Sequence, residues 1–358
     1  MTNHRSFITL ADARLPLFVG ADLGGTNIKV GVVDDLGRPL SWHTVRTDAH
    51  LGPADGARRI AAAVLKAIEL AGVQPRDIAR VGLGSPGTMD IPAGMLLDPP
   101  NLPGWINFPL RDRVSEQCGL PVTFANDAGA AAYGEFWIGC GRDVSSLVLF
   151  TLGTGIGCGI IVDGMSIDGE HSHGAECGHM IIDCSDGARM CQCGRTGHLE
   201  AYAGANAVMK RTLEALEAGH PSVLQARRNR GETLTPLVLS QEAEAGDELA
   251  ATIILETARY LGVGVVSLMH TIDPAIVVIG GAMTWGGHDT ATGRRFLQAV
   301  RDEVQLRGFP APAEQTRIDY ASLGGDAGYL GAAGLARLAH HKACGSSVMG
   351  QALSAGAS

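Results

Sequence analysis

The chain has 358 residues and carries 28 basic against 37 acidic side chains, a formal net charge of −9. This acidic balance argues against a nucleic-acid or membrane-surface partner, because either would need a basic patch, and a hydrophobic content of 46% excludes disorder for most of the chain. The length favours two domains, since a single hydrophobic core stops growing at about 250 to 300 residues. The 49 glycines indicate many tight turns or close backbone approaches.

Charged residues also indicate where the protein resides. Arg5, Asp12 and Arg14 interrupt the N-terminal segment where a signal peptide needs an apolar core, so we expect a cytoplasmic protein. The uncharged run 144–162 approaches transmembrane length, but its glycines and hydroxyl groups indicate two strands around a turn. In such a chain cysteines are more often reduced or metal-bound than paired in disulfides.

Two apolar patterns alternate along the chain. Short apolar runs that end in glycine or polar residues predict buried strands, and apolar residues at a spacing of 3.6 predict helices. In chain order, the sequence predicts strands at 17–19 and 28–33, a helix at 56–71, strands at 78–83 and 121–125, a helix through Ala132 and Glu135, strands at 147–152 and 160–162, helices at 197–217 and 241–271, a strand at 275–279 and a helix at 326–339. This alternation is typical of an α/β protein.

Two segments lack either pattern. Residues 164–196 are rich in Gly, His, Cys and Asp, and they predict a long functional loop. Residues 342–358 are small and polar, and they predict a disordered tail.

Three glycine turns follow predicted strands. Glycines let backbone N–H groups close around phosphate oxygens, and Asp22 in the first turn can hold Mg²⁺ through water. A plain hairpin turn is the alternative for the first turn, and a structural corner for the third. Neither a dinucleotide fingerprint nor a Walker A loop occurs, since there is no Gly-Lys dipeptide. The residues concerned are Asp22, Gly24, Gly25, Thr26 and Asn27, then Gly153, Thr154 and Gly155, then Gly280 and Gly281.

Eight short motifs occur in a fixed order between residues 17 and about 339. They are Asp-Leu-Gly-Gly-Thr at 22–26, Gly-Ser-Pro-Gly at 84–87, Asn-Leu-Pro-Gly-Trp at 101–105, Asn-Asp at 126–127, Leu-Gly-Thr-Gly at 152–155, Glu-Cys-Gly-His at 176–179, Cys-Gln-Cys-Gly at 191–194 and Gly-His-Leu-Glu at 197–200. Each is weak alone, but the ordered series resembles the ROK family of sugar kinases and sugar-responsive repressors. Within that family, the second and third motifs are most similar to those of bacterial glucokinases.

The resemblance implies the α/β, actin-like ATPase (ribonuclease H-like) fold, with two domains and a cleft between them. It implies a small N-terminal domain at 17–130 that the C-terminal helix at about 326–340 joins, and a large domain at 131–325 that contains the loop 164–200. It also implies ATP and Mg²⁺ as cofactors, and a homodimer or homotetramer.

Asp127 matches the family's catalytic position. Phosphoryl transfer needs a carboxylate that accepts the proton of the sugar hydroxyl while Mg²⁺ and the loops hold the phosphates. The alternative role is a helix N-cap, because Asp127 stands where a strand ends and a helix begins. Both roles can hold together.

Six positions match family residues that contact the sugar, and carboxylates, amides and imidazole suit this because they bind several hydroxyl groups. Solvation is the ordinary fate of a lone polar residue in a loop and is the alternative. The six are Gly84, Asn101, Asn126, Glu176, His179 and Glu200.

The cysteine cluster departs from the family pattern, because His198 stands where most zinc-bearing members have a third Cys. The candidate ligands are therefore His179, Cys191, Cys193 and His198. Zn²⁺ accepts two Cys and two His in a tetrahedron, so we expect a structural Zn²⁺. A metal-free loop is the alternative.

Together these residues predict an ATP-dependent hexose kinase that phosphorylates the 6-hydroxyl of glucose. Other sugars of the family remain alternatives, namely N-acetylglucosamine, N-acetylmannosamine, fructose and allose, and polyphosphate could replace ATP. A sugar-sensing repressor is disfavoured, because the roughly twenty residues before Asp22 are too few for a helix-turn-helix. Asp22 and Asp127 argue against a catalytically dead sugar-binding protein.

Overall fold

The computed structural model describes residues 5–99 and 101–345. Contacts divide the chain into two compact units. Unit 1 comprises Met1–Ser145, Gly159–Ala175 and Ser322–Ser358, and unit 2 comprises Ser146–Cys158 and Glu176–Ala321. The boundary expected at 130/131 falls inside a helix of unit 1, and the C-terminal helix belongs to unit 1.

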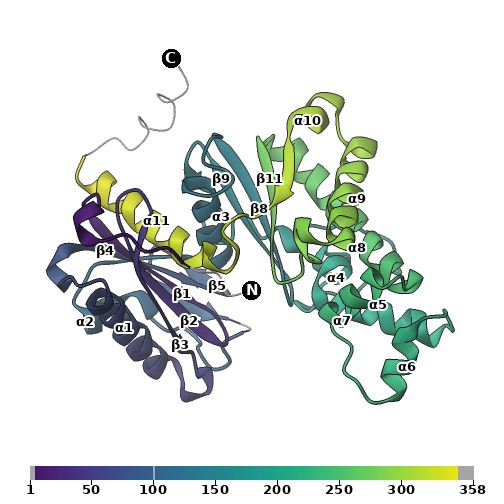
Figure 1. Ribbon diagram of the computed structural model, residues 1–358, viewed down its shortest axis with the longest axis horizontal. Coiled ribbons are helices and arrows are strands. Elements are labelled where there is room, and N and C mark those ends of the chain that lie inside the picture. Colours follow the sequence, from purple (N-terminus) through teal and green to yellow (C-terminus); the bar gives the residue numbers. More distant parts are fainter. Residues whose placement is uncertain (1–4, 100, 346–358) are drawn as a thin grey trace. The chain divides into compact units, whose positions relative to one another are not determined.

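Unit 1 is built on a five-stranded sheet with the strand order β3-β2-β1-β4-β7 (Figure 1). The first three strands form an antiparallel meander, and β1, β4 and β7 run parallel. The elements of this unit are β1 (Leu17–Leu23), β2 (Asn27–Val33), β3 (Pro39–Arg46), α1 (Pro53–Leu70), β4 (Ile78–Ser85), β5 (Thr88–Asp90), β6 (Met95–Asp98), α2 (Leu110–Cys118), β7 (Val122–Asn126), α3 (Asp127–Trp137), β10 (Met165–Ser166) and α11 (Ala327–Ala343).

Helices cover both faces of this sheet, and alternate residues of β1 face them. Leu17 and Val19 belong to the core cluster shared with α1 and α2. Phe18 instead packs with Leu330 and Ala333 of α11. The period of two along a strand explains why one fully apolar segment serves two cores.

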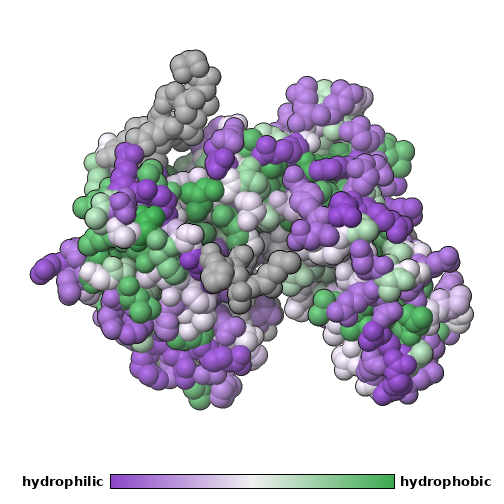
Figure 2. Space-filling model, in the orientation of Figure 1, coloured by the Kyte–Doolittle hydropathy of each residue, from purple (hydrophilic) through white to green (hydrophobic). Residues whose placement is uncertain are grey.

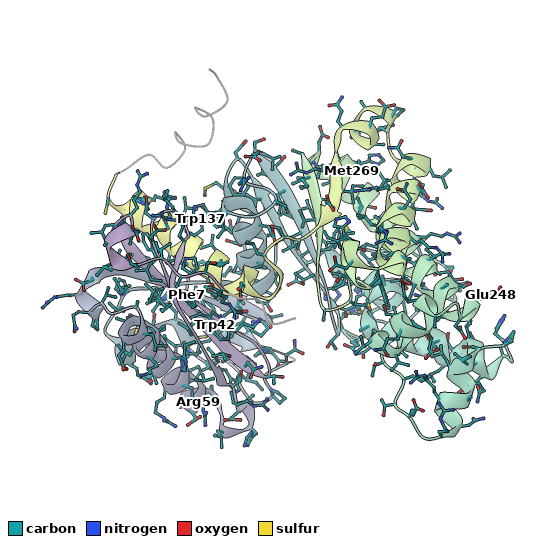
Figure 3. All side chains as sticks on the ribbon, in the orientation of Figure 1. Phe7, Trp42, Arg59, Trp137, Glu248 and Met269 are labelled. Carbon is teal, nitrogen blue, oxygen red and sulfur yellow. The ribbon has the colours of Figure 1, made fainter. Side chains whose placement is uncertain are left out.

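Glycines allow α11 to lie directly against the sheet. A Cβ added at Gly20 would lie 1.8 Å from the carbonyl oxygen of Tyr329, and one at Gly82 would lie 1.8 Å from that of Ala332. The same helix approaches α3, because a Cβ at Gly331 would lie 1.6 Å from the carbonyl oxygen of Ala130. Trp137, labelled in Figure 3, ends α3 beside α11. Larger residues at these glycines would clash with backbone atoms.

Unit 2 contains most of a second five-stranded sheet, with the order β10-β9-β8-β11-β12. Strands β8, β11 and β12 are parallel to one another. The further elements are β8 (Ser146–Leu152), β9 (Ile156–Val162), α4 (Glu200–Ala203), α5 (Ala205–Glu217), α6 (Val223–Asn229), α7 (Pro236–Glu244), α8 (Glu248–Ile272), β11 (Ile276–Gly281), α9 (Ala291–Arg307), α10 (Pro310–Gln315) and β12 (Arg317–Tyr320).

The long helix α8 forms part of the core of unit 2. Met269, labelled on this helix in Figure 3, is 1% exposed. Among the described residues α8 alone is long and apolar enough to cross a membrane, but 61% of its apolar window is buried inside the protein. Burial of this kind is expected of a core helix.

The predicted strands and the α/β alternation are confirmed, and so is the loop at 164–196, which contains only β10 and a short 3-10 helix at Cys177–His179. Two predicted helices are wrong in extent. The helix at 197–217 is broken at Gly204 into α4 and α5, and the helix at 241–271 is divided between α7 and α8. The break before α8 occurs because Asp247 caps it, its side chain accepting a hydrogen bond from the N–H of Ala250.

The C-terminal prediction is only partly tested. Residues 342 and 343 belong to α11, so the predicted tail begins too early. Residues 346–358 lie outside the described residues. Figure 2 shows hydrophilic side chains spread over the viewed face with apolar ones between them, in keeping with the net charge of −9.

Candidate active site

The carboxyl ends of the parallel strands in unit 1 bring four predicted residues to one edge of the sheet. Asp22 on β1 pairs in register with Gly84 on β4, and Ser85 pairs with Asn126 on β7. Asp127 follows directly, and a Cβ added at Gly84 would lie 3.7 Å from the Cα of Asp127. Ligands of open α/β sheets bind at such an edge.

The turn after β1 is exposed and tightly closed. Gly25, Thr26 and Asn27 are exposed, while the N–H of Gly24 donates to the carbonyl of Asn27 at 2.9 Å. The hydroxyl of Thr47 on the neighbouring segment donates to the carbonyl of Gly24 at 2.6 Å. The turn is a hairpin, and its exposed backbone is open to a ligand.

Asp22 has a basic neighbour that the sequence analysis did not identify. Lys29 on β2 pairs in register with Asp22, and its Nζ donates to the carbonyl of Gly325 at 2.6 Å. Burial raises the pKa of the Asp22 carboxyl, while the positive charge of Lys29 opposes that shift. A Cβ at Gly328 would lie 2.5 Å from an Asp22 carboxylate oxygen. A charged residue inside an otherwise apolar strand was the available signal.

Asn126, and not Asp127, is the N-cap of α3. Its Oδ1 accepts hydrogen bonds from the backbone N–H of Ala128 at 2.9 Å and of Gly129 at 3.1 Å. Asp127 is the first helical residue, with one carboxylate oxygen 2.8 Å from the N–H of Ala128. The structure therefore gives the capping role to the neighbour, and Asp127 lies at the positive end of the helix.

Asn101 and Trp105 belong to the same motif but differ in their surroundings. Asn101 is exposed, and a Cβ at Gly25 would lie 3.4 Å from the Asn101 carbonyl oxygen, so Asn101 borders the turn at 24–27. Trp105 is fully buried against Gly56 of α1, and its indole N–H donates to the carbonyl of Ala49 at 3.1 Å. Trp105 is a packing residue.

The other two glycine turns lie together in unit 2. Gly281 pairs in register with Leu152, immediately before the turn at 153–155. Gly281 has a φ of 90°, and a Cβ there would lie 2.3 Å from the carbonyl oxygen of Leu152, so only glycine fits. The N–H of Ala205 donates to the carbonyl of Gly153 at 3.0 Å. The same edge of the second sheet also contains Gly280, Thr154 and Gly155.

Four predicted ligands converge in the loop of unit 2. One ligand atom from each of His179, Cys191, Cys193 and His198 lies within 4.8 Å of all the others. The Nδ1 atoms of the two histidines are 3.2 Å apart, and Cys193 Sγ is 3.3 Å from Nδ1 of His198. Cys191 Sγ is 3.8 Å from Nδ1 of His179. The other ring nitrogen of His179 faces Glu176, with its Nε2 4.0 Å from Oε2.

The proton affinities in this cluster reflect its burial. Burial and the neighbouring His179 lower the pKa of His198, which favours the neutral imidazole that a metal ligand needs. Burial raises the pKa of the Cys191 thiol to about 12. A cation that binds here must therefore displace the thiol proton.

Glu200 connects this cluster with the glycine turn. Its Oε2 accepts a hydrogen bond from the N–H of Ile156 at 2.9 Å, and its Oε1 lies 3.5 Å from Cys191 Sγ. A Cβ at Gly155 would lie 2.1 Å from Oε2, so a larger residue there would displace this carboxylate. Glu200 is the first residue of α4, so the segment from 200 to 205 holds both ends of the turn.

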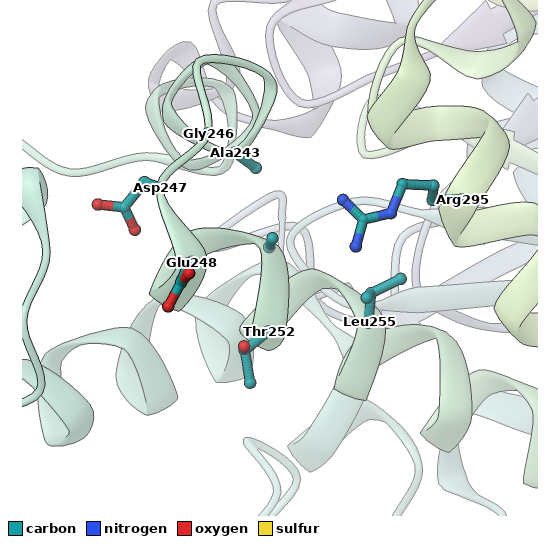
Figure 4. Close-up of a pocket in the computed structure, with 8 residues that line it drawn as sticks. Ala243, Gly246, Asp247, Glu248, Thr252, Leu255 and Arg295 are labelled. Atoms are coloured by element: carbon teal, nitrogen blue, oxygen red, sulfur yellow. The ribbon is translucent and has the colours of Figure 1, made fainter.

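Two hollows in unit 2 differ in their relation to these residues. One of about 180 Å³ is lined by Thr154 and Glu200 together with Lys210 of α5. The other, of about 310 Å³, lies among α7, α8 and α9, and Arg295 points into it (Figure 4). None of the residues that line the second hollow belongs to the predicted site.

Comparison with known proteins agrees with the motifs. Residues 18–339 match the ROK family, and the chain belongs to it. It is similar to the glucokinases of Halalkalibacterium halodurans, at 32% identity over 88% of this chain and 93% of the relative, and of Thermotoga maritima, at 33% identity over 88% and 96%. A ROK family glucokinase from Streptomyces griseus, solved in complex with glucose and AMPPNP, is 32% identical, covers 90% of this chain and 99% of its own, and has a TM-score of 0.73. The predicted actin-like fold is thereby confirmed.

The Glu200 contact yields a prediction about the glycine turn. Glu200→Ala removes the acceptor for the Ile156 N–H, so hydrogen exchange at that amide should accelerate by about tenfold or more. Glu200→Gln keeps an acceptor oxygen and should leave the exchange near that of the unmodified protein. Exchange mass spectrometry of peptides spanning 152–158 measures both. Equal exchange in the Ala and Gln variants would contradict this role of Glu200.

Proposed function

We propose that this protein is an ATP-dependent glucokinase that transfers the γ-phosphoryl group to the 6-hydroxyl of glucose. The observation that carries the proposal is its similarity to glucokinases along nearly the whole chain. The grouping of Asp22, Gly84 and Asp127 at one strand edge supports it, because phosphoryl transfer depends on positioning and on a proton acceptor.

Asp127 acts as the general base in this proposal. Its carboxylate accepts the proton of the attacking hydroxyl as the phosphorus–oxygen bond forms, so no charged alkoxide is released. Because Asn126 caps α3, the Asp127 carboxylate is not needed to hold the helix N-terminus. Asn101, Asn126 and Gly84 of unit 1 would contact the sugar, as would Glu176, His179 and Glu200 of unit 2.

The phosphate groups would be bound by backbone N–H groups. The exposed turn at 24–27 in unit 1 offers such donors, and so do residues 153–155 and the corner at Gly280 and Gly281 in unit 2. Asp22 would bind Mg²⁺ through a water ligand, because its carboxylate lies beside the turn at 24–27. Mg²⁺ would neutralise charge on the phosphates. Lys29 opposes the effect of burial, which still raises the pKa of Asp22.

A structural Zn²⁺ is the second part of the proposal. With Zn–S bonds of about 2.3 Å and Zn–N bonds of about 2.0 to 2.1 Å, the corners of a tetrahedron lie roughly 3.3 to 3.8 Å apart. Three of the separations among His179, Cys191, Cys193 and His198 run from 3.2 to 3.8 Å, and all four ligand atoms lie within 4.8 Å of one another. The residues therefore suit the ion in their chemistry and in these separations. Bound through Nδ1, His179 would keep Nε2 for Glu176 or a sugar hydroxyl.

We also propose a cytoplasmic location, a homodimer or homotetramer, and ATP as the phosphoryl donor.

A panel of hexoses and N-acetylhexosamines, assayed with ATP and separately with polyphosphate, tests the function. We expect ADP release to be fastest with glucose and ATP. Activity confined to another sugar would identify that sugar as the substrate in place of glucose. Sugar binding without turnover would contradict the assignment as a kinase.

Asp127→Asn tests the catalytic assignment. We expect kcat to fall by about 10²-fold or more, since general base catalysis is typically worth 10² to 10⁴. Glucose affinity and melting temperature should change little, because Asn126 retains the helix cap. Coupled ADP release, calorimetric titration of glucose and thermal melting measure the three quantities. A fully active variant would refute Asp127 as the base.

Metal analysis of protein purified without chelator tests the Zn²⁺ site. We expect about one zinc per chain, loss of that zinc in Cys193→Ser, and a glucose KM raised by roughly 10 to 100-fold. His198→Cys should keep the metal, because it restores the usual family ligand.

Cys184→Ser is the matched control for the metal experiment. Cys184 is another exposed cysteine of the same loop, but it lies outside the cluster. Its replacement should leave zinc content and KM unchanged. An unmodified protein without zinc and with normal glucose affinity would mean that packing alone holds the loop.

A further inference from the structure

Glu135 of α3 is a fully buried carboxylate that none of the roles above uses. A charge inside a protein is costly unless donors surround it. Its Oε2 accepts hydrogen bonds from the N–H of Cys140 at 3.1 Å and from the hydroxyl of Ser322 at 2.7 Å. Its Oε1 accepts one from the N–H of Leu323 at 2.7 Å. The donors come from two segments that are far apart in the sequence.

The chain crosses between the two units four times, after Ser145, Cys158, Ala175 and Ala321, and both segments lie next to one of these crossings. The first crossing leaves unit 1 after Ser145, and Cys140 lies between α3 and that exit. The last crossing returns to unit 1 at Ser322, so Ser322 and Leu323 are the first residues after it. One side chain therefore binds the chain on unit 1 at the departing and at the returning connection.

The packing around Glu135 leaves this arrangement little freedom. A Cβ at Gly139 would lie 2.1 Å from Oε2, and the N–H groups of Gly139 and Gly141 donate to the Glu135 carbonyl at 3.1 and 2.9 Å. The Cys140 thiol lies 3.2 Å from Oε2. Burial, and then the charge of Glu135, raise the pKa of that thiol to about 12, so it remains a donor.

We propose that Glu135 is a positioning residue that anchors both connections on unit 1. At these two crossings, movements of unit 2 that accompany sugar binding would then be taken up beyond the Glu135 contacts, at residues 142–145 and at Ala321. Hinge motions concentrate in a few residues at the ends of elements, and altering them changes kcat and KM together. The sugar-dependent part of this inference rests on the proposed function.

Glu135→Gln tests the hydrogen bonds of this side chain without changing its volume, because Gln has the same shape as Glu. The amide has one acceptor oxygen and one NH₂ group, which can only donate. The NH₂ group must face either the N–H of Leu323 or the donors of Cys140 and Ser322. At least one connection therefore loses an acceptor, and the paired arrangement is broken.

Asp34→Asn is the matched control. Asp34 is also a fully buried carboxylate of unit 1, and it accepts hydrogen bonds from the backbone N–H of Leu36 at 3.0 Å and of Arg38 at 2.9 Å. Its other hydrogen bonds in the described part of the chain come from Arg14 and from the side chain of Arg38, so neither connection is involved. A purely structural loss should lower the melting temperature in both variants alike.

Two measurements on the full-length protein test the proposal. Hydrogen exchange at the amide of Cys140 or of Leu323, whichever loses its acceptor, should accelerate by about tenfold or more in Glu135→Gln. Trypsin cleavage after Arg142, whose side chain is 67% exposed, should be slowed by glucose in the unmodified protein and in Asp34→Asn. In Glu135→Gln glucose should no longer slow it. Loss of stability alone would speed cleavage with and without glucose, and would leave the effect of glucose in place.

Several results would overturn the proposal. Unchanged exchange at both amides would show that Glu135 does not anchor the connections. Glucose that binds the unmodified protein without slowing cleavage after Arg142 would remove the proposed movement. If Glu135→Gln does not fold, Ser322→Ala loosens the returning connection alone, and unchanged exchange at the neighbouring amide of Leu323 in that variant would also refute the anchor.

A failure of the proposed function gives a different pattern. In that case glucose would not bind at all in a calorimetric titration. The exchange at Cys140 and Leu323 would still decide whether Glu135 anchors the connections, because it needs no sugar.

Discussion

The close approach of α11 to the sheet of unit 1 is the constraint on which the strand-edge site depends. Gly20 and Gly82 leave room for the backbone of α11, and Gly331 lets the same helix meet α3. Because Asp22 lies near the end of β1 and Asp127 begins α3, this packing fixes the two carboxylates to which we assign metal binding and proton acceptance. Backbone contact leaves no flexible side chain to absorb a shift, so their placement is rigid. Part of the high glycine content thus follows from the close backbone approaches of helix packing, as well as from turns.

A part of unit 2 holds its candidate ligands together almost without regular structure. Residues 176–198 contain a single short 3-10 helix, yet His179, Cys191, Cys193 and His198 converge there. The Glu200 carboxylate touches this cluster on one side and the N–H of Ile156 on the other. A change in the cluster would therefore reach the glycine turn through one side chain. In this way the Zn²⁺ that we propose could influence the phosphate binding that we propose for this turn without contacting the phosphates.

The sequence predicted the strands, the α/β class and the grouping of the four candidate ligands, because burial patterns and motif spacing are local properties. It could not predict where one long apolar pattern divides, since the end of α4 before Gly204 and the start of α8 after Asp247 depend on particular hydrogen bonds. It also offered Asp127 as a cap, although Asn126 one position earlier performs that role. Lys29 and Glu135 were missed because their partners, Gly325 and Leu323, are distant in the sequence. Such pairings are set by the tertiary fold.

His198 illustrates how a departure from a family pattern can preserve geometry. An imidazole is longer than a thiol, so a direct replacement would crowd an ion unless the backbone moved away. Residue 198 forms an isolated bridge with Ile181, and its Nδ1, the ring nitrogen nearer the backbone, faces the cluster. Using the nearer nitrogen shortens the effective reach of the side chain toward that of cysteine. The substitution is therefore accommodated by the choice of nitrogen, and the separations of this Nδ1 from His179 Nδ1 and Cys193 Sγ are close to those of a tetrahedron.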